Sequence, residues 1–167
     1  MPSLAQELRK RHEFALPEQE ATLNIVRTAT RLIEAGERVL KPHGISGPLY
    51  NILRIVRGIG GDGVPSGEIG VQMVTPTPDV TRLVDRLEKL QLAARSRKEG
   101  DRRVVLVRLT PKGRRLLTKL DPIIEQMHRD TLGHLTPSEL RSINELMVRV
   151  RDSPALGKPS GCQPTKD

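Results

Sequence analysis

Cysteine and aromatic residues are almost missing from this sequence of 167 residues. Its one cysteine, Cys162, excludes an intramolecular disulfide framework and a zinc site built on several cysteines. There is no tryptophan, and the aromatic side chains are those of Phe14 and Tyr50. So few aromatic platforms argue against single-stranded nucleic-acid binding by base stacking.

Long apolar runs are missing as well. The longest uninterrupted run, Val104 to Val107, is too short to span a bilayer, and the first ten residues contain nothing that resembles a signal peptide. We therefore expect a cytoplasmic protein without a membrane partner. Hydrophobic residues still make up 36% of the chain, which is enough for the packed core of one domain.

Patterns typical of catalysis or cofactor binding are also missing. The histidines lack the spacing of metal ligands. The run Gly58-Ile-Gly60-Gly-Asp-Gly63 fits the dinucleotide fingerprint G-x-G-x-x-G, but that fingerprint needs a strand before it and a helix after it. Here a helical pattern precedes the run and Val64-Pro65 follows it. We expect a protein that is not an enzyme and that binds neither a cofactor nor a metal.

Positive charge is concentrated in one segment. The whole chain has a formal net charge of +8, and the segment 81–119 alone has 13 basic and 4 acidic residues. The rest of the chain has 15 basic and 16 acidic residues, so it is close to neutral. This concentration is typical of a protein that binds a polyanion. The alternative is a solvated basic surface that only aids solubility.

The spacing of apolar residues predicts a mainly helical chain with one β-hairpin. A flexible N-terminal arm (1–17) precedes the domain, and a disordered tail (153–167), rich in proline, glycine and lysine, follows it. Within the domain (18–152), Ser46, Ser66, Thr77, Thr110 and Thr136 are suited to cap the starts of helices. We expect helices over 18–41, 46–57, 66–73, 77–90, 110–133 and 136–151.

A hairpin follows directly after the helix over 77–90. The run Arg103 to Leu109 is rich in β-branched residues, Ala93 to Arg97 is its expected partner strand, and residues 98–101 are a turn signal. A helix-turn-helix (66–90) followed by such a wing (92–109) is a winged helix-turn-helix. The alternative is an unrelated helical bundle with one hairpin.

The same region resembles the MarR family of bacterial transcriptional regulators. The resemblance rests on the segments Val80 to Leu90, Asp101-Arg-Arg103 and Leu109-Thr-Pro-Lys-Gly113, and extends over about residues 20–151. It implies a homodimer that forms through the N- and C-terminal helices and binds a palindromic operator. Many members of the family release DNA when a small, often aromatic acid binds. Gln91 departs from the family pattern, in which glycine follows the recognition helix.

On the predicted recognition helix, the face opposite the apolar stripe is polar and charged. Recognition helices contact base edges with their N-terminal turns, so Arg82 is suited to guanine and Asp85 to the cytosine amine. Thr77 and Thr81 are suited to contact a phosphate or a thymine methyl group. The alternative is a solvated face with local ion pairs. The candidate DNA-binding residues of this unit are Ser66, Thr77, Pro78, Thr81, Arg82, Asp85, Arg86 and Lys89.

The hairpin carries further basic residues, which we expect at the tip of the wing. Exposed arginines on a hairpin enter minor grooves, whose negative potential attracts them. The resemblance implies that Asp101 orients the wing and that Arg103 touches DNA; the alternative for Asp101 is a plain turn residue. The candidate DNA-binding residues of the wing are Arg95, Arg97, Lys98, Arg102 and Arg103.

These observations predict a sequence-specific regulator that binds double-stranded DNA, most simply a repressor. One recognition helix reads only a few base pairs, so we expect a homodimer. The terminal helices supply apolar positions beyond the needs of the DNA-binding unit: Leu116, Leu120, Ile124, Leu140, Ile143 and Met147. A small-molecule effector is implied by the resemblance alone and would lie between these helices and that unit. The alternative function is a winged-helix interaction module that binds RNA or an acidic protein.

Overall fold

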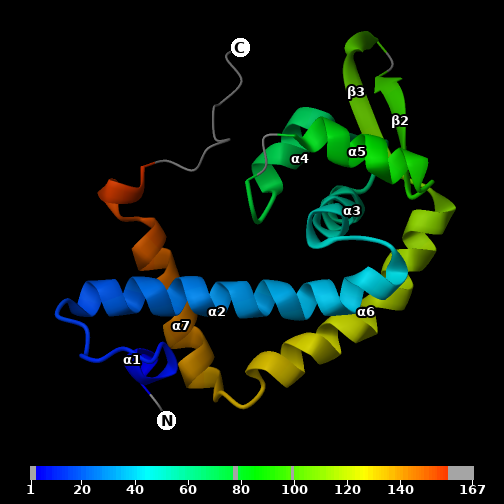
Figure 1. The fold of residues 1–167 in the computed structure, drawn as a ribbon. Coiled ribbons are helices and arrows are strands. Elements are labelled where there is room, and N and C mark those ends of the chain that lie inside the picture. The colour runs from blue at the N-terminus through cyan, green and yellow to red at the C-terminus, as the bar shows by residue number, and fades with distance from the viewer. Residues whose placement is uncertain (1–2, 77–78, 99, 158–167) are drawn as a thin grey trace.

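The structure is a computed structural model that describes residues 3–76, 79–98 and 100–157. It is mainly helical with a small antiparallel sheet, as the sequence predicts (Figure 1). The elements are α1 (Leu4–Glu7), α2 (Pro17–Leu40), η1 (Lys41–His43), α3 (Gly47–Ile59), β1 (Val64–Pro65), α4 (Ser66–Gln72), α5 (Val80–Lys89), β2 (Ala93–Lys98), β3 (Asp101–Leu109), α6 (Pro111–Leu132), α7 (Pro137–Arg151) and η2 (Pro154–Leu156).

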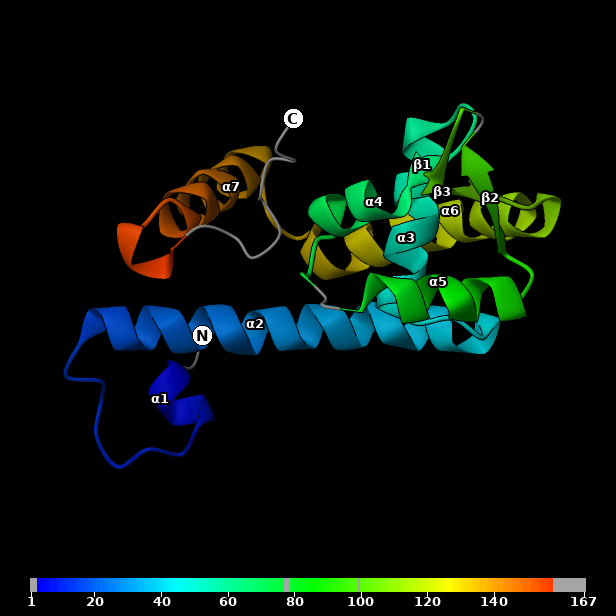
Figure 2. The same ribbon diagram turned by 90° about the horizontal axis from the view of Figure 1, so that it is seen from above.

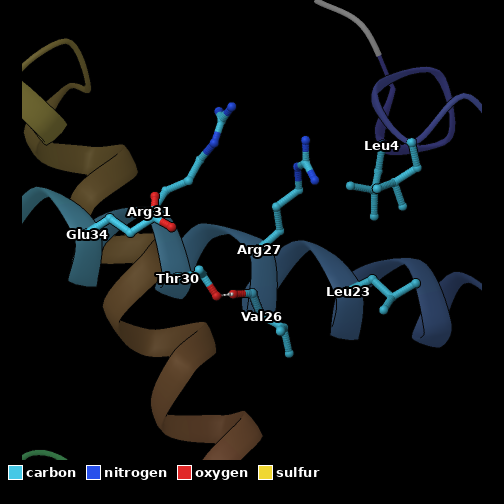
Figure 3. Close-up of a pocket in the computed structure, with 8 residues that line it drawn as sticks. Leu4, Leu23, Val26, Arg27, Thr30, Arg31 and Glu34 are labelled. Atoms are coloured by element: carbon cyan, nitrogen blue, oxygen red, sulfur yellow. Dashed lines mark hydrogen bonds between the residues drawn. The ribbon is translucent and has the colours of Figure 1, made fainter.

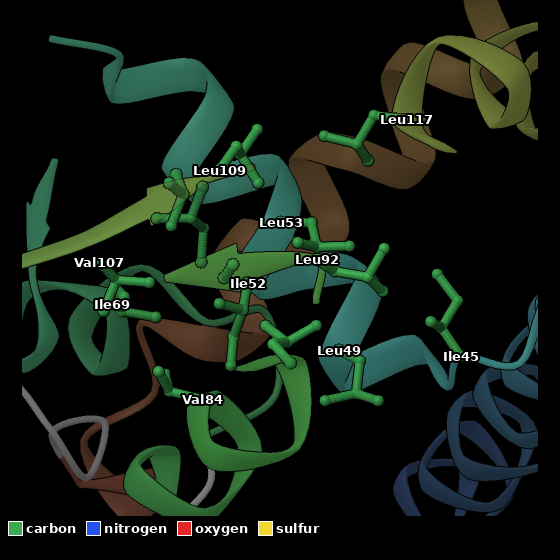
Figure 4. Packing of buried hydrophobic residues seen from close by; sticks show 14 of the residues in the cluster. Ile45, Leu49, Ile52, Leu53, Ile69, Val84, Leu92, Val107, Leu109 and Leu117 are labelled. Carbon is green, nitrogen blue, oxygen red and sulfur yellow. The ribbon is translucent and has the colours of Figure 1, made fainter. Parts of the chain in front are cut away.

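The core lies where α3, α4, α5, the sheet and α6 meet (Figure 4). Ile52 and Leu53 of α3 are fully buried there, against side chains such as Val84 of α5 and Val107 of β3. Leu120 and Ile124 of α6 belong to the same core. We expected these two residues to serve dimerisation, and that expectation is wrong, because their own chain already covers them.

The sheet has the strand order β1-β3-β2, with both pairs antiparallel. The predicted hairpin is present, with Arg95 opposite Val107 and Ala93 opposite Leu109. Between Arg97 and Lys98 the register shifts, so the tip of the wing is irregular. Strand β1 was not predicted, because two residues cannot show the alternation of a strand.

A joint connects the end of α5 to the start of α6. Gln91 follows α5 with a left-handed φ of 59°, the conformation in which the MarR family usually has glycine. Its carbonyl oxygen accepts a hydrogen bond from Thr110 Oγ1 at 2.7 Å, and Lys112 Nζ donates to the Leu90 carbonyl at 2.9 Å. A Cβ atom on Gly113 would lie 2.1 Å from the Leu92 carbonyl oxygen, so only glycine fits at position 113. The joint therefore fixes the direction in which α6 leaves the wing.

Helix starts were predicted with partial success. Thr110 and Thr136 cap α6 and α7 as expected, and Thr136 forms a capping box with Glu139. Thr77 and Pro78 lie outside the described residues, and α5 begins later than predicted, at Val80, because the side chain of Asp79 is its cap. The expectation for Ser66 as a cap is wrong: Ser66 is the first residue of α4 itself.

The two ends of the chain bury fewer side chains than the winged-helix body does. The expected flexible arm contains α1, which packs Leu4 and Ala5 into buried positions. Helix α7 has no buried residue, and it stands apart from the winged-helix body (Figure 2). Of the expected tail, residues 153–157 include the short turn η2, and the remainder lies outside the described residues.

Candidate nucleic-acid interface

Helix α5 turns one face to the core and the other to solvent. Its hydrophobic positions Val84 and Leu87 are fully buried. Because an α-helix turns about 100° per residue, the residues on the side of α5 opposite Val84 and Leu87 point outward. Among the predicted site residues of this helix, the exposed ones are Thr81, Arg82, Arg86 and Lys89. Ser66, at the start of α4, is half-buried.

Asp79 was missed as a functional residue of this helix. One of its carboxylate oxygens accepts a hydrogen bond from the Arg82 backbone N–H at 3.1 Å, and the other lies 2.8 Å from Arg82 Nε. The Arg82 side chain remains 86% exposed. An acidic residue directly before an apolar stripe is an N-cap signal, so the sequence did contain the information. Asp79 thus anchors the base of the Arg82 guanidinium while leaving it in solvent.

Arg95 does not lie at the tip of the wing, contrary to our expectation. In the hairpin register it faces α5, and its side chain is 26% exposed. Its guanidinium donates to Asp85, to Glu88 at 2.9 Å and to the Thr81 carbonyl at 2.9 Å. Asp85 is therefore already paired with a cation in the free protein. Glu88 was not predicted to take part, because partners on different elements leave no spacing signal in the sequence.

The tip of the wing carries a solvent-exposed cation, the guanidinium of Arg103. The Arg103 side chain is 94% exposed, and Asp101 accepts hydrogen bonds from the Arg103 backbone N–H at 3.0 Å and from Nε at 3.4 Å. Arg97 and Lys98, on the neighbouring strand, are also exposed. The side chain of Arg102 lies outside the described part of the structure. Exposed cations of the wing and of α5 thus belong to two elements that Arg95 joins.

Comparison with known proteins agrees with this arrangement. Residues 45–105 match the model of the MarR family. A MarR transcription factor from Planctomyces limnophilus, of known crystal structure, is 36% identical; the match covers 82% of this chain and 99% of that one, with a TM-score of 0.63. The chain belongs to the MarR family.

Two further relatives add functional information about themselves. BpsR of Bordetella bronchiseptica, whose DNA binding is regulated by 6-hydroxynicotinic acid, is 25% identical; the match covers 85% of this MarR chain and 99% of BpsR, with a TM-score of 0.72. The transcriptional repressor MprA of Escherichia coli is 28% identical over 114 residues, which is 67% of this chain and 64% of MprA. This MarR protein is a DNA-binding transcriptional regulator and not an enzyme.

A polar pocket of about 670 Å³ lies between α3 and α6 of this MarR chain. Asp121 of α6 accepts two hydrogen bonds from Arg57, each of 2.7 Å, and one from Arg54 at 3.1 Å. The hydrogen bonds from Arg57 lower the pKa of the Asp121 carboxyl below its ordinary value. The pocket is lined by Tyr50, Asn51, Arg54, Arg57, Asp121, Ile124, Glu125 and His128.

A second hollow, of about 370 Å³, lies between α1 and α2 (Figure 3). Arg27 of α2 lines the hollow and pairs with Glu7 at 2.9 Å. Leu23 and Val26 line the hollow and remain 37% and 57% exposed. The hollow is therefore an open apolar face on a long helix rather than an enclosed binding cavity.

Neither a metal centre nor a membrane span is found in the part of the chain that the structure describes. Within residues 3–76, 79–98 and 100–157, His, Asp and Glu side chains do not gather into a group that would hold a metal ion. None of the helices in those ranges combines the length and the apolar character that crossing a bilayer requires.

Proposed function

We propose that the protein is a repressor that binds a palindromic DNA operator as a homodimer. The observation that carries this proposal is the set of exposed cations on α5, Arg82, Arg86 and Lys89, next to those of the wing. A helix with an exposed basic face suits a major groove, and an arginine on a hairpin suits the adjacent minor groove. The contacts predicted for Ser66, Thr77, Pro78 and Arg102 are part of the same proposal.

The proposed dimer follows from the apolar surface of the terminal helices. A helix of 15 residues without a fully buried side chain is marginal in water, so α7 needs a partner surface. A second copy of the chain provides it with two-fold symmetry, which also matches the symmetry of a palindrome. The exposed apolar side chains available on α2 and α7 are Leu23, Val26, Leu32, Ile33, Ile143, Leu146, Val148 and Val150.

Repression and its release by a ligand are supported by the two relatives and by the α3–α6 pocket. MprA is a repressor, and BpsR responds to a small aromatic acid. The pocket contains Arg54, Arg57 and His128 and lies between α3 of the DNA-binding unit and α6, and a carboxylate ligand would compete with Asp121 for the two arginines. A ligand there releases DNA only if it binds one arrangement of these two helices more tightly than the other.

Selection of bound fragments from a pool of genomic DNA tests DNA recognition directly. We expect a palindromic site, with affinity that falls steeply as salt increases, because phosphate contacts release counterions. Equal affinity for RNA duplexes would favour the alternative, an interaction module for RNA or for an acidic protein. Repression is then measured with a reporter gene placed behind the selected site, with and without phenolic acids.

Two substitutions assign the roles of α5 and the wing. Arg82→Ala should weaken binding to the operator by about 1–3 kcal/mol and relax discrimination at one base position of each half-site. Arg103→Ala should weaken operator and scrambled DNA evenly, and reduce the salt slope by about one phosphate for each monomer. If Arg82→Ala weakens both DNAs equally, the reading face has been assigned wrongly.

A further inference from the structure

All the hydrogen bonds that the structure gives to the Arg95 side chain are made to α5. Nη1 donates to Asp85 and, at 2.9 Å, to Glu88, while Nη2 donates to the Thr81 carbonyl at 2.9 Å. The Arg95 backbone N–H donates to the other Glu88 oxygen at 2.9 Å. The three partner residues follow the steps i, i+4 and i+7, so they form one line along the helix.

These contacts offset a repulsion that two carboxylates of the recognition helix would otherwise exert on DNA. Asp85 and Glu88 are carboxylates on the element that must approach DNA phosphates, and unpaired carboxylates there would repel the backbone of DNA. Asp85 is 46% exposed and Glu88 33% exposed, so both remain close to the surface. The single cation of Arg95 lies against both of them. Its own exposure, 26%, contrasts with 86% for Arg82 and 94% for Arg103.

We propose that Arg95 is a positioning residue for DNA recognition: it neutralises Asp85 and Glu88 and holds the wing strand β2 against α5, without itself contacting DNA. The inference rests on the proposed function in DNA binding and replaces the direct DNA contacts first expected of Arg95 and Asp85. Since the guanidinium also holds the Thr81 carbonyl in the first turn of α5, the helix and the wing approach the two grooves as one body.

The test compares Arg95→Met with Arg97→Met, which removes the same charge two residues further along the same strand. Binding of both variants is titrated on the selected operator and on scrambled DNA at several salt concentrations. Arg95→Met should lose about tenfold or more on the operator while the salt slope is kept, because the protein still neutralises the same phosphates. Arg97→Met should weaken both DNAs and reduce the slope by about 0.9 for each phosphate that the variant no longer neutralises.

A mutant cycle decides whether Arg95 acts through the two carboxylates. In a chain that carries Asp85→Asn and Glu88→Gln, Arg95→Met should cost less than about threefold, because there is no longer a charge to neutralise. A direct DNA contact would make the cost the same in both backgrounds, and that result would overturn the inference. So would an Arg95→Met variant that binds like the unmodified protein.

Folding and function are controlled separately. The helical signal in circular dichroism and the melting temperature are recorded for each variant, and Arg95→Lys, which keeps the charge but reaches fewer acceptors, replaces Arg95→Met if the latter unfolds. The smaller loss expected for Arg95→Lys must also shrink in the double-substituted background, and an undiminished loss would overturn the inference. Failure of the unmodified protein to bind double-stranded DNA refutes the proposed function itself.

Discussion

The winged-helix body and helix α7 differ in whether their apolar side chains are buried. In the body, residues such as Ile52, Leu53 and Val107 are completely buried by other parts of the same chain. In α7, Ile143 and Leu146 are 42% and 52% exposed, and none of its residues is buried. The body is thus stabilised by its own contacts, whereas α7 buries none of its residues against the described part of the chain and, in the proposed dimer, would pack against the second copy.

The largest effect should come from a cavity in the body. Ile52→Ala removes a fully buried side chain from the centre of the core, and should lower the free energy of unfolding by about 2–5 kcal/mol. Urea denaturation followed by circular dichroism measures this loss. Val74→Ala, at a side chain that is 86% exposed, is the control and should change the free energy of unfolding by less than about 0.5 kcal/mol. Similar losses for the two variants would show that the body has been assigned the wrong core.

A charge on α7 should separate the copies without unfolding the body. Leu146→Asp places a carboxylate in the proposed apolar interface, where it finds no partner, and should raise the dimer dissociation constant about 100-fold or more. Sedimentation equilibrium over a range of protein concentrations measures the constant. The neighbouring change Glu145→Gln should leave it nearly unchanged. If Leu146→Asp dimerises normally, α7 does not lie in the interface.

The ion pairs between α3 and α6 should give a smaller, pH-dependent effect. Asp121→Asn removes the charge that binds Arg57 and Arg54, and at neutral pH should lower the free energy of unfolding by about 1 kcal/mol. Since the folded protein lowers the pKa of Asp121, the stabilisation is complete above the ordinary value of 3.8 and is lost as pH falls through the lowered one. The difference between the two proteins should therefore vanish in strong acid.

Denaturation at neutral and acidic pH, at one protein concentration, checks this expectation. The control is Glu125→Gln, which breaks the Glu125–Arg129 pair on α6, whose side chains are about two-thirds exposed. Such an exposed pair contributes little, so its loss should not change stability at either pH. A constant difference between Asp121→Asn and the unmodified protein at all pH values would contradict the assigned ion pair.

The smallest effect should be a gain of stability at the joint. Gln91 has a positive φ, which costs energy for a residue with a Cβ atom, so Gln91→Gly should raise the free energy of unfolding by about 0.5–1 kcal/mol. Gln126→Gly makes the same replacement inside α6, where it should cost about 1 kcal/mol. Two changes of the same sign would mean that the joint does not strain Gln91.

Local signals predicted most of the fold, because helices and hairpins leave periodic patterns and caps in the sequence. Thr136 with Glu139, and the strand from Arg103 to Leu109, are examples in which neighbours along the chain determine the structure. The partners of Arg95 could not be predicted in this way, since they depend on hairpin register and on how the strand packs against α5. Strand β1 was not predicted for a similar reason, because only its pairing with β3 defines it.

The joint at Gln91 and Gly113 has a mechanical consequence. It fastens the recognition helix to one end of α6, a helix of 22 residues and therefore about 33 Å long. With such an arm, a tilt of about 1° at the joint moves the far end by about 0.6 Å. In the proposed dimer, the angle at which each α6 leaves the dimer interface thus sets the separation of the two recognition helices. A change of a few degrees at the terminal helices therefore changes the separation of the two recognition helices by a few ångströms.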